Sequence, residues 1–323
     1  MKKTMTTILS LMLASSVLAG CGEEKAAPKK EEKAPETKEG NQAFPVTIKD
    51  ATGKDVVIEE DPEKIVSLTP SNTEIAYELG LGDEIVGVTD NDNYPEEVSK
   101  KESVGGMEFN VEKVIGLGTD LVLAHELNLS SGKEGLKQLE EAGIDVLVVN
   151  DAADFEEVYQ SFEMIGQATG QTEEAEKAVS EMKQDLADIE EKAKTIKEED
   201  QKKVFVEVSP APEIYTPGNE TFMQEMLDII HAKNAAADKK GWVAMTEEAV
   251  IQSNPDVIVT TYGYYTEKPV EGVLSRKGWE NIPAIKNKAV YDVHSDLVTR
   301  TGPRFVEGVE ELAKAIYPDV FTK

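Results

Sequence analysis

The side chains best suited to hold a ligand are tyrosines in the second half of the chain. Tyr215, Tyr262, Tyr264 and Tyr265 each come shortly after a segment with the pattern of a β-strand. Ligands of α/β proteins bind at the loops that follow the strands. An aromatic face with a hydroxyl group suits a large planar macrocycle or a catecholate. The pattern indicates a ligand site, although a single tyrosine is more often a packing residue.

A second pattern occurs twice, once in each half of the chain. One copy runs from Asn110 to Leu123 and the other from Thr246 to Val259. In both, a capping residue opens a short helix, a glutamate lies on its first turn, an apolar pair follows, and an aspartate precedes a buried strand. The glutamates are Glu112 and Glu248. The repeat predicts two related lobes; the alternative is that αβ units in general share these features.

The order of apolar segments predicts an α/β fold with two Rossmann-like lobes. Strand and helix patterns alternate on both sides of a stretch rich in Glu, Lys, Ala and Gln, and such alternation favours buried parallel sheets. We expect a first lobe over residues 44–165, a connecting helix within 166–200 and a second lobe over 201–323. Apolar residues at helical spacing between Glu173 and Lys197 predict a helix of roughly 37 Å at 1.5 Å per residue.

The N-terminal segment reads as an export signal followed by a tether. Two lysines precede an apolar run from Ile8 to Leu18 that is too short to span a bilayer. The run ends in Leu-Ala-Gly-Cys21, which resembles a bacterial lipoprotein signal, and Cys21 is the only cysteine. We expect residues 1–20 to be a signal peptide, Cys21 to be acylated and residues 21–43 to be a disordered tether. The expected location is the extracytoplasmic face of the cell membrane of a Gram-positive bacterium.

Charge and motifs argue against several other functions. The formal net charge of −29 should repel nucleic acid and anionic lipid heads. The chain has neither a Gly-x-Ser-x-Gly elbow nor a P-loop. Its three histidines, His125, His231 and His294, do not have metal-site spacing. We therefore expect neither an enzyme nor a zinc or manganese binder. A surface enzyme and a structural lipoprotein are the alternatives from other classes.

A set of motifs in a fixed order resembles one protein family. They are the run from Lys64 to Gly80, Val86-Gly-Val, Tyr94-Pro95, Val104-Gly105-Gly106, Asn110-Val-Glu112, Asp120-Leu-Val-Leu-Ala, Trp242 with Glu248, Asn254-Pro-Asp256 and His294-Ser-Asp296-Leu-Val-Thr-Arg300. The chain resembles the helical-backbone solute-binding proteins of ABC importers, which serve uptake of cobalamin, ferric siderophores and haem. It is nearest to the members that bind cobalamin. The resemblance implies two α/β lobes joined by one long helix, with the ligand in the cleft between them.

The resemblance also implies roles for single residues. Trp242, Asp296 and Arg300 match ligand-contacting positions, and we group Tyr215 and Tyr262 with them as ligand-binding residues. An arginine in a cleft offers a planar donor fork to amides, carboxylates or catecholate oxygens. The alternative is that Asp296 and Arg300 pair with each other at the surface.

Two further residues are implied to meet a protein partner. Glu112 and Glu248 match the positions at which the family docks onto arginines of a permease dimer, so the repeat and the resemblance select the same pair. The implied partners are this permease and its ATPase subunits. The protein is expected to be a monomer with no catalytic residue, resident metal or cofactor, and Arg304 is expected to be structural.

Three classes of ligand are compatible with these motifs. Cobalamin comes first, a ferric siderophore second and haem third. Aromatic positions of the cobalamin binders in the first lobe are Asn91, Gly106 and His125 here, which weakens the stacking surface on that side. Met107 and His125 could serve as axial ligands of haem, or they could be ordinary packing and surface residues.

Overall fold

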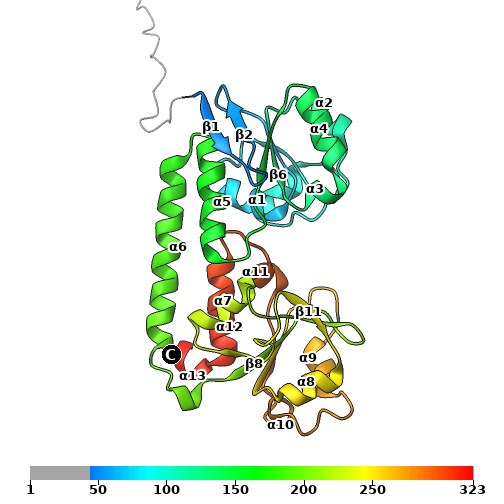
Figure 1. Cartoon of the computed structure of the whole chain (residues 1–323), viewed down its shortest axis with the longest axis vertical. Coiled ribbons are helices and arrows are strands. Elements are labelled where there is room, and N and C mark those ends of the chain that lie inside the picture. The colour runs from blue at the N-terminus through cyan, green and yellow to red at the C-terminus, as the bar shows by residue number, and fades with distance from the viewer. Residues whose placement is uncertain (1–43, 323) are drawn as a thin grey trace, which may run out of the picture. The chain divides into compact units, whose positions relative to one another are not determined.

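A computed structural model describes residues 44–322 of the chain (Figure 1). The expected signal peptide, Cys21 and the tether lie outside the described residues, so those expectations stay predictions. The described part is a mixed α/β structure with two parallel sheets, as the alternation of strand and helix patterns predicted.

The first lobe is built on a five-stranded parallel sheet in the order β5-β4-β3-β6-β7. Its strands are β3 (Ile65–Ser67), β4 (Ile85–Val88), β5 (Glu102–Ser103), β6 (Leu121–His125) and β7 (Asp145–Val149). Its helices are α1 (Pro70–Glu78), α2 (Val111–Gly116), α3 (Asn128–Ser131), α4 (Lys133–Glu141) and α5 (Phe155–Ala168), with a 3₁₀ turn at Glu96–Lys100. Every residue of β3 and β6 is buried, because both faces of a parallel sheet are covered.

A small hairpin precedes this sheet. Its strands, β1 (Val46–Lys49) and β2 (Asp55–Ile58), pair antiparallel. One carboxylate oxygen of Asp50 accepts hydrogen bonds from the backbone N–H groups of Thr52 and Lys54 at 2.9 and 3.0 Å, and Gly53 takes the positive φ that the turn requires. The Asp50 carboxylate and Gly53 therefore stabilise the turn that joins the two strands.

The second lobe is built on a four-stranded parallel sheet in the order β10-β8-β12-β13. Its strands are β8 (Lys203–Glu207), β10 (Lys233–Asn234), β12 (Val257–Thr260) and β13 (Val290–Asp292). A separate antiparallel ribbon consists of β9 (Ile214–Pro217) and β11 (Trp242–Met245). The helices are α7 (Phe222–Ile229), α8 (Glu247–Ser253), α9 (Pro269–Leu274), α10 (Pro283–Lys286), α11 (Ser295–Thr299), α12 (Phe305–Ile316) and α13 (Pro318–Phe321).

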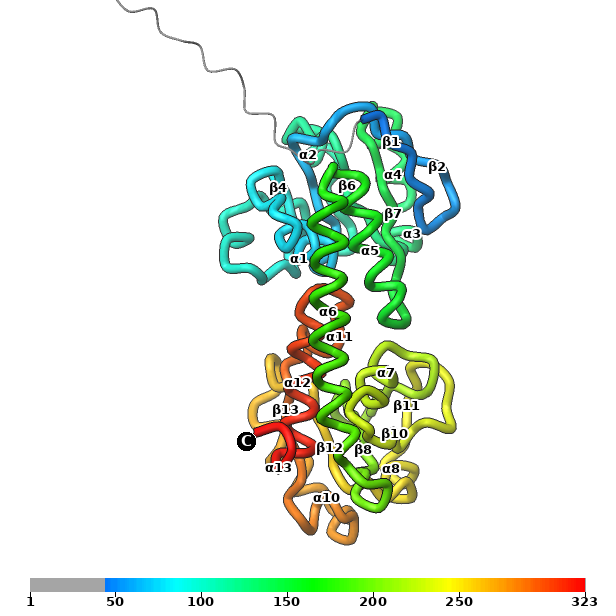
Figure 2. The backbone as a smooth tube through the Cα atoms, turned by 90° about the vertical axis from the view of Figure 1, so that its left-hand side faces the viewer, coloured from blue at the N-terminus to red at the C-terminus, as the bar shows by residue number. Residues whose placement is uncertain are grey.

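One long helix, α6 (Thr172–Ala193), connects the two lobes. It packs against α5 of the first lobe and against α7 and α12 of the second, as Figure 2 shows. Its buried stripe is formed by Ala175, Val179, Met182, Leu186 and Ile189, the residues whose helical spacing the sequence shows. The helix ends four residues before the predicted Lys197, because the chain turns after Ala193 and buries Ile196.

The two copies of the repeated pattern are structurally equivalent. Asn110 caps α2 and Thr246 caps α8, each accepting a hydrogen bond from the backbone N–H three residues on. Asp120 and Asp256 then each accept a hydrogen bond at 2.9 Å from a backbone N–H at the start of the neighbouring strand. The donors are Lys64 and Lys203. In both sheets the strand after this aspartate lies beside the first strand of its lobe. The repeat therefore reflects one scaffold used twice.

The lobes also meet directly through a group of aromatic rings. Phe155 at the start of α5 lies 5.3 Å from Phe222 of α7 and 4.7 Å from Phe305 of α12, measured between ring centroids. Glu225 of α7 accepts a hydrogen bond from the backbone N–H of Phe155 at 2.7 Å. A carboxylate at a helix N-terminus interacts favourably with the helix dipole, so this polar contact reinforces the apolar one.

Candidate functional site

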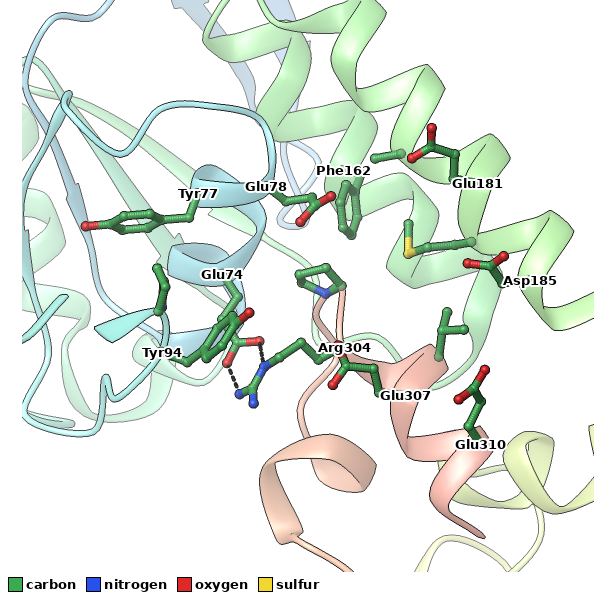
Figure 3. Close-up of a pocket in the computed structure, with 15 residues that line it drawn as sticks. Glu74, Tyr77, Glu78, Tyr94, Phe162, Glu181, Asp185, Arg304, Glu307 and Glu310 are labelled. Carbon is green, nitrogen blue, oxygen red and sulfur yellow. Dashed lines mark hydrogen bonds and ion pairs between the residues drawn. The ribbon is translucent and has the colours of Figure 1, made fainter. Parts of the chain in front are cut away.

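A single buried carboxylate holds two arginines between the lobes. Glu74 lies on α1 of the first lobe, and its side chain is 1% exposed. It accepts hydrogen bonds from Arg300 Nη1 at 2.9 Å and from Arg304 Nε and Nη2 at 2.9 and 2.6 Å. The guanidinium of Arg304 also lies 4.0 Å from the centre of the Tyr94 ring, as Figure 3 illustrates. Arg304 therefore has the structural role that the sequence suggested.

Asp296 and Arg300 extend this network toward the loop after β4. Arg300 Nη2 lies 3.1 Å from Asp296 Oδ1, so these two residues form the pair that the sequence left open as the alternative to ligand contact. The pair also contacts the first lobe: the Asn93 amide donates to Asp296 at 2.9 Å and accepts from Arg300 Nη1 at 2.7 Å. Arg300 Nη2 donates to the Asn91 carbonyl at 3.3 Å. The pair thus belongs to an inter-lobe network.

Two of the expected ligand residues share an exposed face of the β9/β11 ribbon. Tyr215 stands opposite Ala244 in the register, and Trp242 lies two residues from Ala244 on the same side of its strand. Diagonal neighbours of this kind are within reach of large aromatic side chains. Tyr215 is 43% and Trp242 49% exposed. The ribbon therefore presents two aromatic side chains that the protein's own core does not use.

A second exposed aromatic group follows β12 and β13. The Tyr264 and Tyr265 rings lie 4.7 Å apart, edge to face, and the His294 ring lies 6.4 Å from Tyr264. His294 Nδ1 accepts a hydrogen bond from the backbone N–H of Asp296 at 3.2 Å. Because β8, β12 and β13 are parallel neighbours, this group and the ribbon both lie at the carboxyl edge of the second sheet, the edge at which α/β proteins bind ligands.

Tyr262, expected among the ligand residues, is a buried structural residue instead. Its side chain is 1% exposed, and its hydroxyl donates to Glu207 at 2.6 Å. Glu207 also accepts from Arg276 Nη1 at 2.7 Å. Burial and the Glu207 carboxylate raise the pKa of the Tyr262 hydroxyl. This tyrosine therefore offers no surface to a ligand in the structure.

In the first lobe, His125 is poorly placed for an axial ligand. It is 4% exposed, its Nδ1 accepts from the backbone N–H of Leu127 at 3.3 Å, and its Nε2 lies 3.8 Å from Asp151. Burial lowers the pKa of the imidazole, although the nearby Asp151 and Glu126 oppose this. Met107 is exposed. Within residues 44–322 no group of three or more His, Cys, Asp or Glu side chains is arranged to hold a metal ion.

The two glutamates of the repeat are exposed and unpaired. Glu112 and Glu248 lie on the first turns of α2 and α8, and neither forms an ion pair or side-chain hydrogen bond within residues 44–322. The neighbouring Glu247 differs, because it accepts a hydrogen bond from the indole of the buried Trp279 at 3.1 Å. Of the neighbours Glu247 and Glu248, it is therefore Glu248 whose carboxylate is free to meet a partner protein.

Glu74 and Arg304 also border a cavity of about 450 Å³ on the side that faces α6 (Figure 3). Six of the residues that line it are acidic, namely Glu74, Glu78, Glu181, Asp185, Glu307 and Glu310. Tyr215, Trp242, Asp296 and Arg300 do not line it. The cavity is thus distinct from the aromatic edge of the second sheet.

Sequence reasoning missed several residues of the site. Asn93 links the lobes, yet nothing in its sequence context distinguishes it from an ordinary loop residue. Tyr94 stands in a recognised motif, but its partner, Arg304, lies far away in the chain. Glu74 has capping-box spacing to Ser71; in the structure its carboxylate binds the two arginines.

Comparison with known proteins identifies the family. Residues 65–297 match the family described as periplasmic binding protein. The chain is 57% identical over 99% of its length to an uncharacterized ABC transporter substrate-binding lipoprotein, YvrC, of Bacillus subtilis strain 168, and covers 99% of that protein. It is 28% identical, over 79% of its length and 88% of the relative's, to a vitamin B12-binding protein of Photorhabdus laumondii.

A solved structure agrees with these relatives. It is described as a possible iron-binding (periplasmic solute-binding) protein from Staphylococcus epidermidis, and it superposes with a TM-score of 0.72 at 38% identity, covering 80% of this chain and all of that one. The chain belongs to the periplasmic binding protein family, the solute-binding components of ABC transporters. The resemblance inferred from its motifs is confirmed, and the protein is a binding protein and not an enzyme. No helix within residues 44–322 is long and apolar enough to cross a membrane.

The inter-lobe network predicts a stability effect. Glu74→Gln removes the charge that compensates two partly buried arginines, and breaking such a buried pair typically costs about 3–5 kcal/mol. We expect a fall of that size in the free energy of unfolding, measured by denaturant titration. Glu310→Gln, which removes an exposed partner of Lys314, is the matched control and should change stability by less than about 1 kcal/mol. Equal stabilities of the two variants would contradict the role given to Glu74.

Proposed function

We propose that this protein captures a corrinoid such as cobalamin outside the cytoplasm and delivers it to the permease of an ABC importer. The observation that carries the proposal is the exposed aromatic face of Tyr215 and Trp242 at the carboxyl edge of the second sheet. A corrin is a large macrocycle with an apolar ring and amide side chains. Aromatic faces can pack on the ring, and neutral polar groups can bind the amides. Asp296 and Arg300 are proposed to border this site.

A ferric siderophore is the second candidate. The relative from Staphylococcus epidermidis, described as a possible iron-binding protein, favours it. The tyrosine-rich edge formed by Tyr264 and Tyr265 suits an aromatic chelate as well as a corrin. Haem is less favoured, because the imidazole of His125 is buried and already hydrogen-bonded.

The aromatic face predicts a binding defect that leaves folding intact. Trp242→Ala should weaken cyanocobalamin binding by about 1–3 kcal/mol if the indole is an anchor. Because the side chain is half exposed, the free energy of unfolding should change by less than about 0.5 kcal/mol. Calorimetric titration measures the first quantity and denaturant titration the second. Lys240→Ala, close to Trp242 and exposed, is the control. Unchanged affinity in Trp242→Ala would place the site elsewhere.

Membrane attachment is proposed to occur through Cys21, which lies outside the described residues. The lipoprotein relative from Bacillus subtilis supports this. Cys21→Ser should leave the chain unacylated and move it from the membrane to the soluble fraction, since buried acyl chains contribute roughly 0.8 kcal/mol per methylene. Fractionation followed by a high-salt, alkaline wash measures the change. A Cys21→Ser variant that stays membrane-bound through the wash would refute acylation as the anchor.

Delivery to the permease is proposed to use Glu112 and Glu248. Two exposed carboxylates at equivalent points of the repeat can form charge-assisted hydrogen bonds to arginines of a two-fold permease. Lys113, beside Glu112, pairs instead with Glu102 at 2.9 Å, so it does not pair with the Glu112 carboxylate.

The docking proposal predicts a loss of transport without a loss of binding. Glu112→Arg with Glu248→Arg should leave cobalamin affinity nearly unchanged while uptake into vesicles reconstituted with the permease and ATPase falls sharply. Glu173→Arg with Glu174→Arg is the matched control, because these acids are also exposed, lie on the first turn of α6 and give the same charge change. Normal uptake by the Glu112/Glu248 variant, or a parallel loss of affinity, would contradict docking.

A further inference from the structure

The whole chain contains three arginines, Arg276, Arg300 and Arg304. Each of them binds a buried glutamate. Arg276 pairs with Glu207, whose side chain is 0% exposed, and Arg300 and Arg304 share Glu74. Arginine is the side chain whose planar fork best matches carboxylates and other dense anions. In this protein every such fork already has a carboxylate partner.

Arg300, which pairs with Asp296 beside His294, has little capacity left for a ligand. A guanidinium carries five N–H groups, four of them on Nη1 and Nη2. Nη1 donates to Glu74 and Asn93, and Nη2 contacts the Asn91 carbonyl and Asp296. All four Nη hydrogens therefore have partners within the protein. Turning the fork toward a ligand would leave the buried Glu74 with one arginine instead of two.

Lysines near the aromatic edge do not replace this charge. Lys239 and Lys240, just before Trp242, pair with Asp238 and Glu220. Lys268, which follows the Tyr264–Tyr265 pair, pairs with Glu271. The exposed carboxylates of a chain with a formal charge of −29 also repel anions. An anion approaching this edge meets paired cations and a negative surrounding field.

We infer that the site selects chelates of zero or positive net charge and discriminates against anionic ones. The inference rests on the proposed function, because it concerns the ligand of that site. It favours an amide-bearing corrinoid or a neutral or cationic ferric hydroxamate. It disfavours haem with its two carboxylates and ferric tricatecholates.

Two pairs of probes separate charge from shape. The first pair is cyanocobalamin and its monocarboxylates, in which one peripheral amide is hydrolysed to an acid. The second pair is ferrioxamine B, a cationic ferric trihydroxamate, and ferric enterobactin, a trianionic tricatecholate. We expect each carboxylate to bind roughly tenfold more weakly than its amide parent, the factor that about 1.4 kcal/mol gives. The tricatecholate should bind more weakly than the trihydroxamate.

A variant tests whether the paired arginine causes this preference. Asp296→Asn removes the negative charge that pairs with Arg300 and leaves the contact of Arg300 with Glu74 in place. The amide-to-carboxylate difference in affinity should then shrink at least about threefold, roughly 0.65 kcal/mol. Asp319→Asn makes the same charge change on an exposed residue of α13 and should leave the difference as it is. An unchanged difference in Asp296→Asn would overturn the assignment to Arg300.

The remaining outcomes distinguish this inference from the proposed function. Equal or tighter binding of the carboxylates or the tricatecholate would overturn charge selection and leave a solute-binding role intact. Binding of ferrioxamine B alone would overturn the corrinoid assignment and support charge selection. Failure of every probe to bind would overturn both.

Discussion

The Glu74 carboxylate is the interaction on which the arrangement of the two lobes depends. A buried carboxylate is costly unless it is paired and hydrogen-bonded, and Glu74 satisfies this requirement only with arginines from the other lobe. Those arginines fix the end of α11 and the start of α12, and through Asn93 the loop after β4. Together with α6 and the Phe155 aromatic contact, this gives three separate links between the lobes. A protein linked in this way resists wide hinge bending.

The same constraint determines how charge is distributed. The chain is strongly acidic and has three arginines, and all three pair with buried glutamates. Arg276 pairs with Glu207, and the other two share Glu74. The acids left on the surface are mostly unpaired or matched to exposed lysines, whose ion pairs contribute little to stability. An acidic surface with free first-turn glutamates suits a basic partner surface. The three arginines are therefore structural, and the first-turn glutamates proposed for docking remain without a basic partner in the described part of the chain.

Local patterns in the sequence predicted the elements that depend on local physics. Apolar runs identified the strands, helical spacing identified the buried stripe of α6, and cap residues identified α2 and α8. Contacts between distant segments could not be predicted. Arg304 and Glu74 lie 230 positions apart, and the β9/β11 ribbon depends on the pairing of two short segments with no strong strand pattern. Tyr262 was misjudged for this reason, because its buried partner Glu207 is on another strand.

The two lobes share a scaffold and a first-turn glutamate, yet the loops at their strand ends differ. In the first lobe the exposed large side chains after strands include Tyr94, Met107 and Leu127, and the Tyr94 ring already packs on Arg304. The second lobe exposes Tyr215, Trp242, Tyr264 and Tyr265. Rigid aromatic side chains give large contact area at low entropic cost. Under the proposed function, the second lobe supplies most of the aromatic contact with the ligand, because four of its aromatic side chains are exposed and the first lobe exposes Tyr94. Because Glu112 and Glu248 lie on equivalent helices, docking can remain symmetric while ligand recognition is one-sided.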